Sequence, residues 1–126
     1  MKNKILTGLS ILFALMMVNS GLNKFFNYMP MPVMSEEMMQ IMGGFLTIKW
    51  ILPLVAVVEI IAGAFMAMPK TRALGAIMIL PVMVGILVHH LVHDISGIGI
   101  ALLLFGINIW AIIANWNKYV PILKVE

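Results

Sequence analysis

The chain has 126 residues, of which 63% are hydrophobic and 10% are charged, with no cysteine and a net charge of +3. Soluble domains carry about 45–50% apolar and about 25% charged residues, so this composition argues strongly against a water-soluble fold and indicates an integral membrane protein. Without cysteine, the chain has no disulfide, iron–sulfur or thiolate-zinc site of its own. Its positive charges are scattered, which favours topology signals over a nucleic-acid partner.

Four long apolar stretches follow one another, each close to the roughly 18–20 residues that cross about 30 Å of hydrocarbon. Only helices suit such short spans, because a lipid-exposed strand edge would leave backbone groups unpaired. The stretches cover about 5–26, 45–68, 73–93 and 97–115. The sequence therefore predicts an all-α integral membrane protein, a single transmembrane domain over residues 1–126 folded as a four-helix antiparallel bundle.

The distribution of lysine and arginine predicts the orientation. If the N-terminus is inside, only Lys24 and Lys49 fall at outer ends. Six fall at inner ends: Lys2, Lys4, Lys70, Arg72, Lys118 and Lys124. The positive-inside rule then predicts cytoplasmic termini in a bacterial inner membrane. Lys2 and Lys4 before an apolar run are also typical of a secretory signal, but we expect a retained helix.

The connection between the first two stretches is the only long one. Ser35 followed by Glu36 and Glu37 is typical of a helix N-terminus, and the apolar residues that follow predict an amphipathic surface helix over about 35–42 in the outer loop. Gly43 and Gly44 are expected to end it.

Glu59 lies near the middle of the second apolar stretch, where an ionisable residue costs at least about 2.5–3.5 kcal/mol and needs a reason. Helical steps from it reach Ala56, Gly63 and Ala67, a small-residue stripe that predicts close helix packing and an inward-facing carboxyl. Two interpretations stay open. Glu59 either accepts protons or binds a headgroup, or it is a structural residue hydrogen-bonded to Asn108 in the fourth stretch.

Lys49 precedes Glu59 by ten residues, about 15 Å along a helix, so we expect it to snorkel to the interface and not to pair with Glu59. Pro53 and Pro81 are expected to kink their helices. The first stretch carries a packing seam that ends at the rim in a lysine. The seam consists of Thr7, Ser10, Ala14, Met17, Gly21 and Lys24. Asn19 and Asn23 add hydrogen-bonding groups near its outer end.

The third stretch ends in His89-His90-Leu91-Val92-His93-Asp94. His89 and His93 have a spacing that suits zinc or copper if further ligands join, but we favour histidines hydrogen-bonded to carbonyls or to Asp94. Since no other histidine exists, an intrachain bis-histidine haem is not expected. Thirteen methionines, several of them in the outer loop, would suit Cu(I), yet we favour membrane packing.

Together these motifs resemble the DoxX-like family of small four-helix membrane proteins, in particular its short bacterial members. The resemblance covers nearly the whole chain and is carried by Gly21-Leu22-Asn23-Lys24-Phe25-Phe26, Met31-Pro32, Glu59-Ile60-Ile61-Ala62-Gly63, Leu80-Pro81, His90-Leu91-Val92-His93-Asp94, Ser96-Gly97 and Asn108. Many relatives have an arginine early in the first helix, where this chain reads Leu9-Ser10-Ile11, so a role for that arginine does not carry over.

The resemblance implies several functions, because family members are associated with membrane redox complexes and quinone-linked sulfur oxidation, and distant relatives with chaperone or cargo-receptor roles. Our leading hypothesis is an accessory redox subunit that binds a quinone or similar lipophilic molecule near the outer face. The candidate ligand-binding residues are Asn23, Lys24, Glu59, His90, His93, Asp94 and Asn108. No catalytic residue is assigned, and whether the chain is an enzyme stays open.

Two alternatives remain. The chain is either a non-catalytic assembly partner, in contact with another membrane protein or with a second copy of itself, or, as a weaker alternative, a protein that handles copper or zinc on the outer side through His89 and His93.

Overall fold

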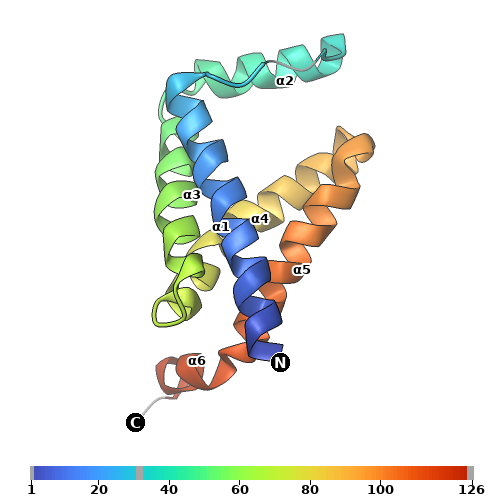
Figure 1. Ribbon diagram of the computed structural model, residues 1–126. Coiled ribbons are helices and arrows are strands. Elements are labelled where there is room, and N and C mark those ends of the chain that lie inside the picture. Colours follow the sequence, from blue (N-terminus) through green and yellow to red (C-terminus); the bar gives the residue numbers. More distant parts are fainter. Residues whose placement is uncertain (1, 31–32, 125–126) are drawn as a thin grey trace.

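The computed structural model describes residues 2–30 and 33–124, and this part of the chain is all helical (Figure 1). The elements are α1 (Lys2–Phe26), α2 (Glu36–Thr47), α3 (Ile51–Ala67), α4 (Arg72–Val92), the 3-10 turn η1 (Ile95–Gly97), α5 (Ile98–Ala114) and α6 (Trp116–Leu123). The Met31-Pro32 motif lies outside the described residues.

Three segments are long and apolar enough to cross a membrane, namely Lys4–Phe26, Arg72–Val92 and Ile95–Ala114. A fourth candidate is the pair α2 and α3, which meet at an angle of 88°. The chain is therefore a multi-pass membrane protein with three spans, or with four if the bent pair counts as one.

Figure 1 shows how these helices are arranged: α1 and α3 run side by side in opposite directions, while α4 and α5 tilt away from them. At one end of the molecule, here called the α2 end, α2 extends from the ends of α1 and α3 toward the side on which α4 ends. The start of α1 and all of α6 lie at the opposite end, called the α6 end.

The predicted small-residue seams are confirmed in large part, with Thr7, Lys24 and Ala67 only half-buried. On α1, Ser10, Ala14, Met17 and Gly21 are buried. On α3, the buried residues are Ala56, Glu59, Ala62, Gly63 and Met66. Because these side chains are small or unbranched, α1 and α3 pack closely along their length, which fixes the two helices that carry the charged residues discussed below.

The boundary between α2 and α3 differs from the prediction. Gly43 and Gly44 do not end α2, which continues to Thr47. Each glycine lowers helix stability by about 1 kcal/mol, which is not enough to end the helix. The hydroxyl of Thr47 donates to the Gly43 carbonyl at 2.9 Å. The sharp turn then comes at residues 48–50, so α3 has 17 residues and not the 24 expected for 45–68.

Pro53 starts a helix and does not kink one. It is the third residue of α3, where the missing N–H would have no partner within the helix anyway. The first backbone hydrogen bond of α3 runs from Leu54 N to Trp50 O at 3.1 Å. Pro81, by contrast, lies inside α4, as expected.

α6 was not predicted, because eight residues that include Pro121 are too short and too polar to register as a span. Tyr119 fixes it to the bundle: the buried phenol donates to the Ala73 carbonyl of α4 at 2.6 Å. Burial raises the pKa of Tyr119, which keeps the hydroxyl protonated and able to donate.

Arg72 performs a similar role at the turn between α3 and α4. Its guanidinium is buried and donates from Nε to the Met66 carbonyl at 2.9 Å and from Nη1 to Thr7 Oγ1 at 3.3 Å. A cation near the last carbonyls of a helix satisfies groups that have no partner within the helix and complements the helix dipole. Arg72 thereby joins α1, α3 and α4 at the α6 end.

Gly75 lies where α3 and α4 approach closely, and it generates our first prediction. A Cβ at this position would lie 2.7 Å from the Ala62 carbonyl oxygen and 2.8 Å from Met66 N, and backbone atoms cannot easily move aside. Gly75→Ala is expected to destabilise the protein by roughly 1–3 kcal/mol. Thermal or SDS-induced unfolding in mild detergent measures the change.

Gly106→Ala is the matched control, because a Cβ at Gly106 in α5 meets nothing within 4 Å. It should be neutral or stabilise by up to about 1 kcal/mol. Equal stability of the two variants would contradict the close packing of α3 on α4.

Candidate functional site

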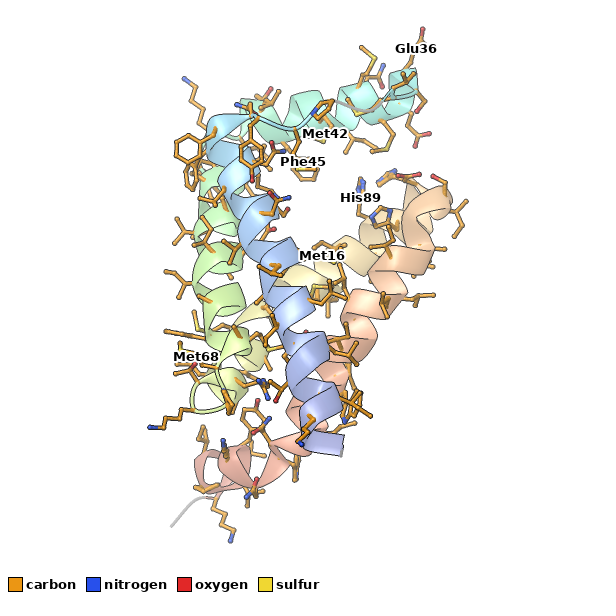
Figure 2. The ribbon with its side chains drawn as sticks, in the orientation of Figure 1. Met16, Glu36, Met42, Phe45, Met68 and His89 are labelled. Carbon is orange, nitrogen blue, oxygen red and sulfur yellow. The ribbon has the colours of Figure 1, made fainter. Side chains whose placement is uncertain are left out.

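A cavity of about 540 Å³ lies between α1, α2, α3 and α4 near the α2 end. Most of its wall is apolar, formed by Met42, Phe45, Ile51, Leu52, Val55, Pro81, Val82, Gly85 and Ile86. Four polar residues interrupt this wall, namely Lys24, Glu59, His89 and His90. In Figure 2, Met42 and Phe45 extend from α2 toward the space that His89 faces from the other side. An apolar cavity with a few polar groups is the usual form of a small-molecule site.

Lys24 and Glu59 form an ion pair across the α1–α3 contact. Lys24 Nζ lies 2.7 Å from Glu59 Oε1, and it also donates to Ser20 Oγ at 3.0 Å. The side chain of Glu59 is only 1% exposed and that of Lys24 is 25% exposed, so the carboxylate is the buried member of the pair. Glu59 Oε2 has no hydrogen-bond partner among the described residues.

This pairing corrects the sequence-based interpretation of Glu59, which considered only Asn108 as a partner. Asn108 is fully buried on α5, but its amide donates to the Ala76 carbonyl of α4 at 2.9 Å. Asn108 is therefore a helix-packing residue, and it does not line the cavity.

The pair has an electrostatic consequence. An uncompensated buried carboxylate would cost several kcal/mol, and the adjacent ammonium offsets that cost. The pair has no net charge and lines an otherwise apolar cavity, with an ammonium group that is partly exposed and a buried carboxylate oxygen, Oε2, that has no partner among the described residues. Such a wall suits a neutral, polar head better than a strongly charged one.

The histidine run at the end of α4 divides between two roles. His90 lines the cavity, and its Nδ1 lies 3.0 Å from the backbone carbonyl oxygen of Asp94. His93 does not line the cavity; its Nδ1 lies 3.3 Å from Glu37 Oε1 and so connects the end of α4 to α2. Asp94 accepts a hydrogen bond from Ser96 and shapes the turn into η1.

Asn23 also has a local role. Its side-chain oxygen accepts a hydrogen bond from Met29 N at 2.9 Å, and its carbonyl accepts from Asn27 N at 2.7 Å. Asn27 adopts a left-handed conformation, with φ of 51°, that ends α1 in the manner of a helix C-cap. Of the seven predicted ligand-binding residues, the structure thus brings three together at the cavity: Lys24, Glu59 and His90.

The prediction missed the contribution of α2. Met42 and Phe45 lie three residues apart on one face of this helix, a spacing that places both side chains over the cavity. The expectation that α2 ends at Gly43 had separated Phe45 from it. His89, which was considered only as a metal ligand, also lines the cavity.

The metal hypothesis gains no support. Within residues 2–30 and 33–124, no group of three or more His, Asp or Glu side chains is placed to hold a metal ion. The rings of His89 and His93 lie with centroids 5.6 Å apart and are tilted by 47°, and the only carboxylate in contact with His93 among these residues is that of Glu37.

Comparison with known proteins identifies a family. No curated protein and no solved structure matches the chain. The family model that matches is DoxX, over residues 5–94, which is more than two thirds of the sequence and includes every residue that lines the cavity. The chain therefore belongs to the DoxX family.

Proposed function

We propose that this protein binds a lipophilic molecule with a neutral, hydrogen-bonding head, of the quinone class, and that it serves a membrane redox system as an accessory subunit. The observation that carries the proposal is the Lys24–Glu59 pair at the wall of an otherwise apolar cavity. A quinone has polar oxygens on an apolar ring with an apolar tail, and this cavity offers a counterpart for each part.

The hydrogen-bonding capacity of the pair supports this assignment. An ammonium group has three donors, and Lys24 directs its Nζ toward Ser20 and Glu59, which leaves one donor for a ligand oxygen. Glu59 Oε2 is free to accept from a ligand hydroxyl. Phe45, Leu52 and Ile86 offer apolar contact to a ring and a tail.

The proposal assigns electron transfer to a partner. The chain contains no cysteine and only three histidines, all within five residues of one another, so an iron–sulfur cluster or a bis-histidine haem must come from another protein. The role of this chain is then to hold the lipophilic molecule and its protons near that partner.

By the count of lysines and arginines, the α2 end faces the outside of a bacterial inner membrane and the α6 end faces the cytoplasm. The cavity would then open toward the outer leaflet, where a lipophilic molecule can enter from the bilayer.

A second candidate function, membrane-protein assembly, rests on α2. This helix has no buried residue, and Met39 and Leu46 on it are largely exposed. An adaptable, methionine-containing surface suits a protein partner. Crosslinking from α2 in native membranes tests it, since a stable partner captured there in the absence of any cavity ligand would favour this function.

Quinone binding in mild detergent gives the second prediction. Wild-type protein is expected to bind decylubiquinone, and Lys24→Met is expected to weaken binding at least about tenfold, because a charge-assisted hydrogen bond is worth about 1.5–3 kcal/mol. Equilibrium dialysis or calorimetry on protein without a histidine tag measures the affinity.

Lys49→Met is the matched control, since Lys49 is exposed in the turn between α2 and α3 and does not line the cavity. It removes the same charge and should bind as wild type does. Identical affinity in folded Lys24→Met protein, verified by gel filtration, would count against the proposed site.

The third prediction separates folding from binding. Lys24→Met alone leaves Glu59 buried without a partner and should lower stability by on the order of 3 kcal/mol. The double variant Lys24→Met with Glu59→Met replaces the pair by apolar side chains, which is often neutral or stabilising. Its thermal stability should return to that of wild type while binding stays lost. Recovered binding in the double variant would contradict a ligand role for the pair.

A further inference from the structure

We propose that the cavity selects a ligand with a hydroxyl group, so that it binds the reduced, dihydroxy form of a quinone in preference to the dicarbonyl form, with His90 as the residue that determines this specificity. This inference rests on the proposed function and names the form of the ligand. It starts from the hydrogen bond that His90 already makes.

The Asp94 carbonyl fixes the proton on one nitrogen of His90. Nδ1 lies 3.0 Å from the backbone oxygen of Asp94, and a carbonyl only accepts, so Nδ1 must carry the hydrogen. In a neutral imidazole the other nitrogen is then an acceptor. Nε2 has no hydrogen-bond partner among the described residues, and because His90 lines the cavity, we assign this nitrogen as the acceptor for a ligand there.

Gly97 holds the ring of His90 in this position. A Cβ at Gly97 would lie 2.5 Å from Cε1 and 2.6 Å from Nδ1 of His90, so the ring lies directly on the glycine. The ring of His89 stands edge-on to that of His90, with centroids 5.4 Å apart. The turn from α4 into η1 and the neighbouring histidine therefore restrict the direction of Nε2.

The polar groups of the cavity offer acceptors as well as donors. Glu59 Oε2 and His90 Nε2 accept, Lys24 donates, and the imidazole of His89 has one nitrogen of each kind when neutral. Glu59 is 1% exposed, so its free oxygen is a buried, unpartnered acceptor that itself requires a ligand donor. A carbonyl oxygen of a quinone would meet these lone pairs with its own, whereas a hydroxyl can donate to them and still accept from Lys24.

The test compares decylubiquinol with decylubiquinone, under anaerobic conditions at about pH 8, where an ordinary imidazole is neutral. Wild type is expected to bind the quinol about tenfold more tightly, the effect of roughly one satisfied hydrogen bond. Gly97→Ala displaces the His90 ring without touching the rest of the wall, and His90→Phe removes the acceptor; both should bring the two affinities to within about twofold.

Gly99→Ala is the control, because a Cβ at Gly99 meets nothing within 4 Å, and it should keep the wild-type preference. If wild type binds both forms equally, or if His90→Phe keeps the preference, the inference is wrong and the proposed function stands. If wild type binds neither form, the proposed function fails with it. Gel filtration and thermal unfolding of each variant separate lost binding from lost folding.

Discussion

The ion pair between Lys24 and Glu59 constrains this structure more than any other interaction. A carboxylate that is 1% exposed in a membrane protein needs a cation in contact, and the pair can form only if α1 and α3 pack at close range. The small residues on both helices, such as Gly21 and Ala56, allow that packing. Packing at the α6 end, through Arg72 and Gly75, then sets α4 against α3. The splayed α2 end, with the cavity, is what this arrangement leaves open (Figure 1).

The sequence was sufficient for the long apolar helices α1, α4 and α5, for most of their inward faces, and for the choice of Lys24, Glu59 and His90 as members of one site. It was not sufficient for the pair, and the reason is an error of depth. A helix that begins at residue 45 puts Glu59 about 21 Å from its end, whereas α3 begins at Ile51 and puts it about 12 Å from its end. Helical side chains also lean toward the N-terminus, which directs the lysine from the rim of α1 into the bundle. Both effects bring Lys24 within reach of Glu59.

The 88° turn between α2 and α3 could not be predicted from hydropathy, because α2 is as apolar as a span on one face. What decides it is local: Pro53 favours a helix start just upstream, and Ser35 caps α2 by accepting from Met38 N at 3.2 Å. The turn moves six residues out of the expected span and places Phe45 over the cavity instead. The bend shortens α3 and also places residues of α2 in the wall of the cavity.

The histidine run at the end of α4 also has two structural roles. His93 connects the end of α4 to α2 through Glu37. His90 is held on the cavity side by the Asp94 carbonyl and by Gly97. His90 and His93 are three positions apart, slightly less than one helical turn, so their side chains point in different directions. The end of one helix therefore contacts α2 and also faces the cavity. Because α2 has no buried residue, the contact between His93 and Glu37 is a partly exposed link between α2 and the end of α4. One short segment, residues 89–97, therefore supplies both a wall of the cavity and a contact with α2.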